Sequence, residues 1–403
     1  MAYRPHLRLP WELEEEILTR LPSKVLVRFR AVCKQWNSLF NDRSFVYNHL
    51  SLSRPQFILL TKYTIYSIDI TDPTTKLREL HSSRHDLILS NVNITTCDEF
   101  LFCNYPRRWE RGTALWNPWL RQVKWIKLVV DKHFDVFGLG YDNSGPEKVH
   151  KMLGYLRCPS KFQTDSYLER VSMKVVDNVY KMLDYFRSQP EDQINTYPER
   201  VAIYECASQT LRFIDTPDEE DMPICETAKR SHVSLNGNLY WIACNRQTRE
   251  YFIQSFDFSR EVFKPVCPLP FQKRHEQFLA VFKGDRFSLL TQCYLTRKIE
   301  IWVTKRKIDD REEVVWMNLM TLTATNLPKL FNKLYGVSYF IYDKNLVMCC
   351  GDDETGKLCI YVVKGDTCSK IQLGSDLNRL ASRITWFSHC AYVPNWTSVP
   401  LEF

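Results

Sequence analysis

The stretch LPWELEEEILTRLPSKVLVRFRAVCKQW, residues 9–36, carries the signals of three short helices. Pro10 suits the first turn of a helix, because the amide hydrogen that proline lacks would have no partner there. A run of glutamates follows, and acidic side chains favour the positive end of the helix dipole. Pro22 ends this helix, Ser23 can cap the next one, and a third short helix follows around Trp36.

The apolar residues of this stretch form faces that need a cover. Those at helical spacing are Leu13, Ile17, Leu18 and Leu21 on the first segment, and Val25, Leu26 and Phe29 on the second. A unit of about 35 residues buries too little surface to be comfortable alone. Each fully buried Leu or Ile adds roughly 1.5–3 kcal/mol, so the rest of the chain or a partner protein must cover several of them.

The order of these residues resembles the F-box. The matching positions are Leu9-Pro10, Glu16-Ile17-Leu18, Arg20-Leu21-Pro22, Leu26, Arg28-Phe29-Arg30, Val32-Cys33-Lys34, Trp36 and Leu39, with Val25 as a departure where many relatives carry serine. The resemblance implies binding to the Skp adaptor and, through it, to a cullin–RING ubiquitin ligase. It places Leu9, Pro10, Ile17, Leu18, Leu21, Pro22 and Leu26 against the adaptor, and gives Phe29, Val32 and Trp36 a shared role in core and interface.

The remaining chain changes texture after a last short helix predicted in SFVYNHL. From Phe57 onward, short runs rich in Ile, Val, Phe, Tyr and Thr alternate with turn residues, as in QFILLT, KIEIWVT and KLCIYVV. HVSLNGNLYWIA joins two such runs through Asn236-Gly237, the strongest short hairpin signal. The pattern predicts a large all-β domain, and its many short strands favour a β-propeller-like arrangement over a single sandwich.

Several segments of this part resemble the plant F-box-associated domain. They occur in the family order and include ALWNPWLRQVKWI, FGLGYDN, VAIYECASQTLRFI, VSLNGNLYWIA and SFDFSREVF. Glu99 departs from the usual glycine, and YVPNW replaces a more usual apolar ending. The predicted fold is therefore a small all-α F-box of three short helices, residues 1–50, followed by a large all-β, β-propeller-like domain for substrate recognition, residues 51–403.

A tandem duplication lies around residues 148–201. VHKMLGYLRCPSKFQTDSYLERV (149–171) and VYKMLDYFRSQPEDQINTYPERV (179–201) align without gaps, at an offset of 30 residues, and match at 11 of 23 positions. A surplus strand pair cannot easily join a closed ring, so one copy should pack in the sheet while the other loops out or adds to an edge. Deletion of His150–Val179 is then expected to leave the melting temperature unchanged or higher.

Composition excludes several classes of protein. The net charge of +7 is spread thinly along the chain, which argues against a nucleic-acid partner. The sequence shows no signal peptide and no apolar run that could span a membrane, so we expect a cytoplasmic and/or nuclear protein with no membrane partner. The 14 cysteines then read as reduced, and they lack the paired spacing of a zinc site, so no metal or cofactor is expected.

No catalytic motif appears, and the chain is expected to be a non-enzymatic subunit. FGLGYD has a G-x-G but lacks the third glycine and the helix of a nucleotide site, so its glycines are read as easing a strand or bulge. The leading hypothesis is a substrate-recognition adaptor of an Skp–cullin–F-box ligase that recruits an unknown target protein. Alternatives are an F-box lectin-like protein that binds glycans and, with less support, a propeller hydrolase. Candidate target contacts are Arg107, Arg108 and Trp109, in the polar segment PRRWERG.

Overall fold

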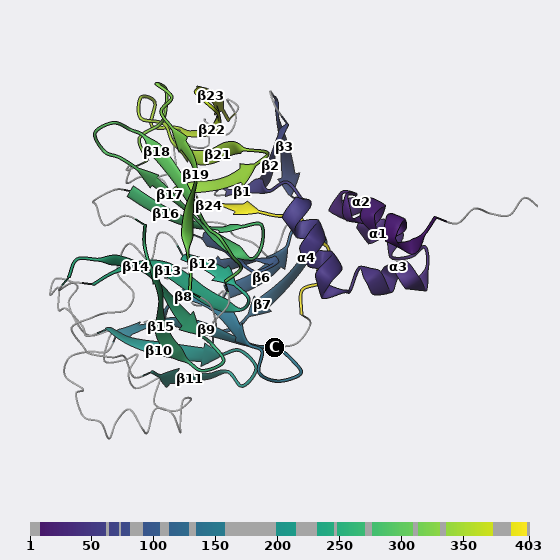
Figure 1. Cartoon of the computed structure of the whole chain (residues 1–403). Helices are drawn as coiled ribbons and strands as arrows, with labels where there is room; N and C mark the ends of the chain where they lie inside the picture. Colours follow the sequence, from purple (N-terminus) through teal and green to yellow (C-terminus); the bar gives the residue numbers. More distant parts are fainter. Residues whose placement is uncertain are drawn as a thin grey trace, which may run out of the picture.

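Four short helices precede six four-stranded antiparallel sheets in the computed structural model (Figure 1). The structure describes residues 9–61, 64–71, 74–80, 92–104, 113–128, 134–157, 199–214, 232–245, 248–270, 276–308, 313–330, 336–373 and 388–400. The helices are α1 (Trp11–Thr19), α2 (Ser23–Phe29), α3 (Lys34–Leu39) and α4 (Arg43–Leu52). The first three are those predicted in the opening stretch, and α4 covers the last short helix expected before the strands. Residues 9–52 are called the helical unit below.

Each sheet is one blade of a propeller. From the innermost strand outward, blade 1 holds β24 (Ser388–Tyr392), β1 (Gln56–Leu60), β2 (Ile65–Thr71) and β3 (Thr74–Leu80); blade 2 holds β4 (Asn93–Cys97), β5 (Phe100–Asn104), β6 (Thr113–Asn117) and β7 (Gln122–Ile126); and blade 3 holds β8 (Phe134–Asp142), β9 (Val149–Arg157), β10 (Glu199–Glu205) and β11 (Thr210–Phe213).

The second half of the ring repeats this order. Blade 4 holds β12 (His232–Leu235), β13 (Asn238–Cys244), β14 (Tyr251–Asp257) and β15 (Val262–Pro268); blade 5 holds β16 (Glu276–Phe282), β17 (Arg286–Gln292), β18 (Ile299–Thr304) and β19 (Trp316–Leu322); and blade 6 holds β20 (Ser338–Tyr342), β21 (Asn345–Gly351), β22 (Leu358–Lys364) and β23 (Thr367–Gln372). The fold is a six-bladed β-propeller, which confirms the predicted fold class.

Blade 1 closes the ring with strands from both ends of the domain. β24 pairs with β1 in antiparallel register, with Gln56 opposite Tyr392 and Leu60 opposite Ser388. β24 also lies beside β4 and β20, the innermost strands of blades 2 and 6. Closure by hydrogen bonds removes the open sheet edges that invite aggregation.

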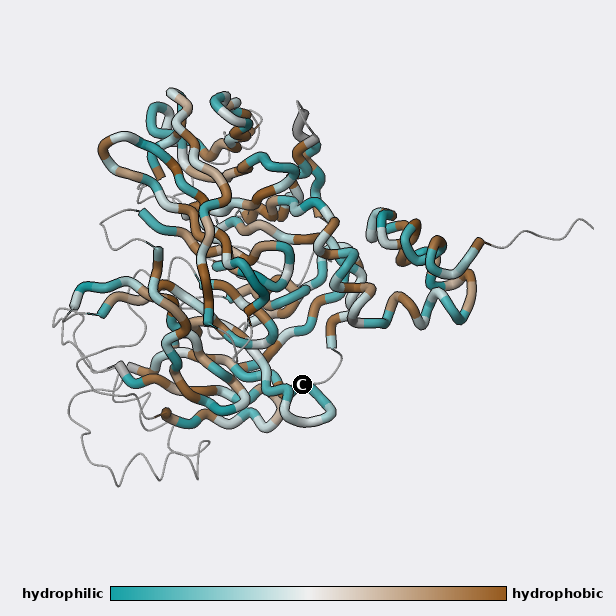
Figure 2. Tube along the Cα trace, in the orientation of Figure 1, coloured by the Kyte–Doolittle hydropathy of each residue, from teal (hydrophilic) through white to brown (hydrophobic). Residues whose placement is uncertain are grey.

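Apolar side chains fill the spaces between neighbouring blades, where strand centres are the most hydrophobic parts of the trace (Figure 2). Between blades 3 and 4, Leu153 and Ile203 pack with Trp241 and Phe256, and all four side chains are fully buried. Each buried aromatic residue removes a large apolar area from water, so these interfaces hold the blades together.

The predicted hairpin and the glycines of FGLGYD meet at one inter-blade contact. Asn236 and Gly237 both have positive φ, 53° and 81°, as a two-residue hairpin turn requires. The Tyr141 amide donates to the Gly237 carbonyl at 3.0 Å. A Cβ on Gly140 would stand only 2.3 Å from that carbonyl oxygen, so a side chain cannot fit there. The strand also has a register irregularity between Val136 and Gly138, which confirms the reading of these glycines as strand and bulge residues.

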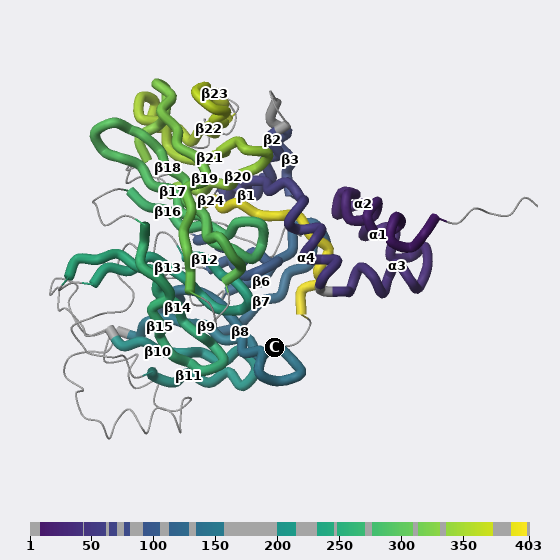
Figure 3. The backbone as a smooth tube through the Cα atoms, in the orientation of Figure 1, coloured from purple at the N-terminus to yellow at the C-terminus, as the bar shows by residue number. Residues whose placement is uncertain are grey.

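The propeller has two distinct faces. The helical unit enters β1 at Gln56, which pairs with Tyr392, so the unit lies on the face that carries the β4–β5 and β12–β13 turns (Figure 3). We call this the helical face. Strands alternate in direction within a blade, so β9 ends and β10 begins on the opposite face. The β17–β18 turn, with Leu295 at 93% exposure, also lies on the opposite face.

Candidate functional site

Three apolar side chains on and just before α1 are unusually exposed. Leu9, Leu13 and Ile17 are 53%, 47% and 50% exposed and recur every four residues. This spacing places them along one side of the helix. We call these three residues the α1 stripe. Val32, between α2 and α3, is a further large apolar side chain at 61% exposure.

The ten residues expected to contact the adaptor fall into three groups. Leu9, Pro10, Ile17, Pro22 and Val32 are exposed; Leu21, Phe29 and Trp36 are partly buried; Leu18 and Leu26 are buried. Leu18 and Leu26, at 2% and 0% exposure, pack with Leu39, Phe40 and Phe45 in the core of the helical unit. This corrects the expectation that these two leucines face the adaptor, because the small unit uses them for its own core.

Leu13 was missing from the resemblance-based set, although it belongs to the exposed stripe. The signal that could have found it is its position between Leu9 and Ile17 at spacing i, i+4, which the periodicity of the sequence already showed. Leu13 therefore joins Leu9, Ile17 and Val32 as a candidate contact residue.

The partly buried aromatic residues hold α3 against the first two helices. The ring centroids of Phe29 and Trp36 lie 5.3 Å apart, and Trp36 Nε1 donates to a Glu14 carboxylate oxygen at 3.2 Å. Because Trp36 links α3 to α1 through this bond, it helps to fix the geometry of the α1 stripe.

The helix caps differ in part from the predicted pattern. Pro10 stands at the N-cap of α1, with Glu12 and Glu14 in the first turn, as expected. Asp42 caps α4 by accepting from the amides of Ser44 and Phe45, and its hydrogen bonds, that from the Ser44 hydroxyl first, lower the pKa of its carboxyl. The prediction that Ser23 caps α2 is wrong. Its hydroxyl donates instead to the Pro394 carbonyl at 2.7 Å, far away in the sequence.

Helix α4 is the part of the helical unit that rests on blade 5. The Tyr47 hydroxyl hydrogen-bonds the Asp285 carboxylate, and the Lys307 ammonium lies 4.6 Å from the centre of the Tyr47 ring. Burial and the negative charge of Asp285 raise the pKa of Tyr47, so the phenol stays protonated and keeps its bond to Asp285.

The described residues show chemistry of packing rather than of a cofactor site. No group of three or more His, Cys, Asp or Glu side chains within them could hold a metal ion. Their thiols are free and mostly buried, and burial raises the pKa of Cys103 and of Cys206 to about 12. No helix in the described part of the chain is long and apolar enough to cross a bilayer.

The candidate target contacts Arg107, Arg108 and Trp109 lie outside the described residues. They fall between the end of β5 and the start of β6, which are both on the face opposite the helical unit. Most of the duplicated segment, residues 158–198, also lies outside the described residues, between β9 and β10 on that same face. The assignment of these three residues to a target remains a prediction.

Comparison with known protein families gives matches along most of the chain. The F-box domain family matches residues 6–48, and the F-box associated beta propeller domain family matches residues 56–177 and 167–399. The two propeller matches overlap within the duplicated segment.

Curated relatives match over nearly the full length. Protein SUPPRESSOR OF NIM1 1 of Arabidopsis thaliana is 53% identical, and the alignment covers 98% of this chain and 99% of that protein. A second F-box protein of Arabidopsis thaliana is 48% identical, with 98% of each chain covered. Among solved structures, the crystal structure of a nidogen/laminin complex covers 85% of this chain and 100% of its own matched chain, at 10% identity and a TM-score of 0.42.

Proposed function

Because this chain belongs to the family of F-box proteins with an F-box-associated β-propeller domain, we propose that it is the substrate-recruiting subunit of an Skp–cullin–F-box ubiquitin ligase. The α1 stripe is the observation that carries this proposal. Three large apolar side chains about half exposed in one row are costly in water and are typical of a surface that a partner covers. The Skp adaptor is the partner that the F-box match implies.

The proposed mechanism is tethering without catalysis by the chain itself. The helical unit binds the adaptor, the propeller binds a target, and the ligase brings a charged conjugating enzyme close to the target's lysines. Binding at two sites of one chain raises the effective concentration of the lysines near the enzyme. The face opposite the helical unit is the proposed target surface, because it is the face left open when the adaptor occupies the helical unit.

The glycan-binding alternative has weaker support. A sugar-binding groove uses exposed aromatic rings for stacking. The large side chains of Trp116, Trp241 and Trp396 are buried in the structure, so these three rings are not available to a sugar.

The experiment is a calorimetric titration of the purified full chain with the Skp adaptor. We expect a 1:1 complex with a dissociation constant below about 1 μM, which corresponds to about 8 kcal/mol of binding free energy. A chain that gives a cooperative unfolding transition but no binding heat at any temperature tried, and that does not co-elute with the adaptor, contradicts the proposal.

A further inference from the structure

We infer that residues 393–400, which follow β24, complete the core of the helical unit and fix its orientation on the propeller, so that Trp396 and Asn395 are positioning residues for ubiquitin transfer. These eight residues are called the closing segment below. The consequence for transfer rests on the proposed function, whereas the structural role of the segment can be tested without it.

Trp396 is a core residue of the helical unit although it lies far from it in sequence. Its side chain is 1% exposed and belongs to the same cluster as Leu18 and Leu26. Its ring centroid lies 6.2 Å from that of Phe40 and 4.5 Å from that of His49. Its Nε1 donates to the Phe40 carbonyl at 2.8 Å, so the indole is satisfied in both its apolar and its polar parts.

The helical unit is too small to make this core from its own residues. Without Trp396, the cluster would lose its largest side chain, and a cavity would remain between Phe40, Phe45 and His49. The buried bond from the Ser23 hydroxyl to the Pro394 carbonyl, at 2.7 Å, attaches α2 to the same segment. The closing segment thus contacts the unit on two of its elements.

Asn395, the neighbour of Trp396, holds the segment to the propeller. Its side-chain amide donates to the Glu99 carbonyl at 2.6 Å, in the β4–β5 turn of blade 2. Its carbonyl oxygen accepts from Asn117 Nδ2 at 2.9 Å, and the same Nδ2 donates to the Thr397 carbonyl at 2.8 Å. Asn117 and Asn395 are 0% and 1% exposed, so these bonds are protected from water.

Two adjacent side chains therefore point into two different parts of the molecule. Asn395 bonds blade 2, and Trp396 enters the helical unit. With the chain connection from α4 into β1 and the contact of Tyr47 on blade 5, the unit is attached at three separate blades. Attachment at three points around the ring prevents the unit from rotating about the single linker to β1. A target on the propeller is then presented to the adaptor-bound ligase at a fixed position, which sets the effective concentration of its lysines.

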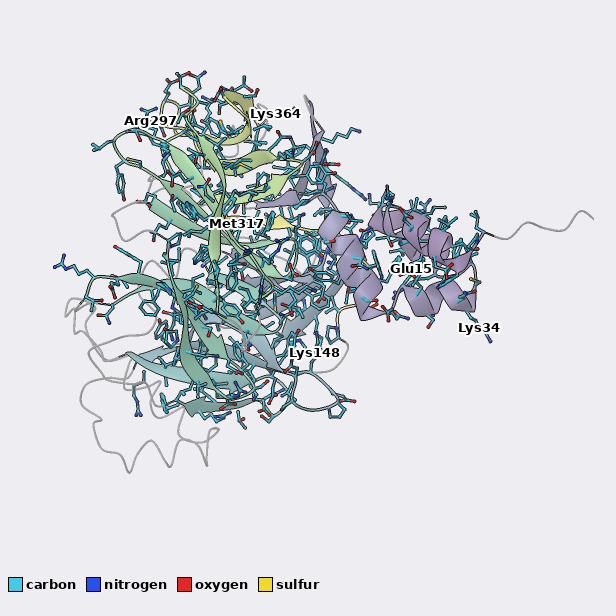
Figure 4. The ribbon with its side chains drawn as sticks, viewed as in Figure 1. Glu15, Lys34, Lys148, Arg297, Met317 and Lys364 are labelled. Carbon is cyan, nitrogen blue, oxygen red and sulfur yellow. The ribbon has the colours of Figure 1, made fainter. Side chains whose placement is uncertain are left out.

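The test measures the distance distribution between two dyes by single-molecule energy transfer. The dyes are attached to unnatural amino acids placed at Lys34 on α3 and Lys364 on β22, both of which are exposed (Figure 4). We expect a narrow distribution for the unchanged chain and at least a twofold broader one for both Trp396→Ala and Asn395→Ala. The unfolding temperature of the propeller should stay within a few degrees in both variants.

The matched control is Trp316→Ala, which removes a partly buried tryptophan of blade 5 that bonds Pro268 and not the helical unit. It should leave the distribution as narrow as in the unchanged chain. If Trp396→Ala melts the helices, Asn395→Ala decides, because it leaves the helical core intact. Unchanged distributions in a folded Asn395→Ala chain overturn the inference.

Adaptor affinity is measured on the same samples. An unchanged chain that does not bind the adaptor refutes the proposed function, while the distance distribution still decides the role of the closing segment. With adaptor binding intact, Asn395→Ala should bind the adaptor within about threefold of the unchanged chain. A loss of binding in that folded variant would show a direct contact role instead of a positioning role.

Discussion

Deletion of Cys158–Arg187 is expected to leave the unfolding temperature within about 3 °C of the full chain, whereas deletion of His150–Val179 is expected to destabilise the chain severely. Both deletions remove 30 residues and leave one copy of the duplicated unit. They differ in which copy supplies β9. Their comparison by thermal unfolding, monitored by circular dichroism, separates the length of the segment from the residues that enter the sheet.

The physical reason is the glycine at position 154. β9 is built from the first copy, Val149–Arg157, and β10 begins at Glu199 near the end of the second copy. Deletion of His150–Val179 puts Asp184 at the position of Gly154. A Cβ there would lie 2.5 Å from the Asp135 carbonyl oxygen and 2.8 Å from the Phe134 ring. Overpacking together with burial of a carboxylate should lower the free energy of unfolding by about 3 kcal/mol or more.

This outcome corrects the expectation, drawn from the sequence alone, that removal of His150–Val179 is harmless. The two copies look interchangeable in an alignment, but the close approach of the β8 backbone admits only glycine at this point of β9. The control is Gly154→Asp in the full chain, which should reproduce most of the loss. Equal stability of both deletions would refute the glycine argument, and aggregation of the Cys158–Arg187 deletion would show that the removed segment is structural.

Replacement of Leu13 and Ile17 together by aspartate is expected to weaken adaptor binding by at least about a hundredfold. Each side chain is about half exposed in the free chain, so its remaining area is available for burial in the complex. Loss of that burial removes roughly 1 kcal/mol per residue. The two carboxylates must also leave water when the partner covers the helix, which adds a larger penalty. Calorimetric titration against the adaptor measures the change.

The matched control is Leu77→Asp with Val262→Asp. These residues are 46% and 45% exposed, on the outer strands β3 and β15 of the propeller. The control therefore makes the same chemical change at the same exposure, far from α1. It should leave the affinity within about twofold of the unchanged chain. If the control weakens binding as much as the α1 variant, charge on the whole chain, rather than the stripe, governs the interaction.

Local signals predicted much of this fold. Pro10, Pro22 and the glutamates of α1 gave the helix boundaries within a residue or two, because these residues act on their own backbone. Asn236-Gly237 gave a hairpin for the same reason, since the turn needs positive φ at both positions. The regular succession of short strands, together with the resemblance, gave the propeller.

Contacts between distant residues could not be predicted from these signals. Trp396 fills the core of a helical unit that ends more than 300 residues earlier, and Ser23 bonds Pro394 rather than capping α2. The burial of Leu18 and Leu26 follows from the same packing. Helical spacing shows that a side chain lies on an apolar face, but not whether that face meets the chain or a partner. The division into residues 1–50 and 51–403 thus omits the contribution of the closing segment to the first part.

Hydroxyl-radical footprinting of the full chain, alone and bound to the Skp adaptor, tests the central claim most directly. The account predicts that oxidation of Leu13, Ile17 and Val32 falls at least severalfold in the complex. Leu295, at 93% exposure on the face opposite the helical unit, should keep its reactivity. Protection of Leu295 with full reactivity of the α1 stripe would contradict the account, because the adaptor would then occupy the face proposed for the target.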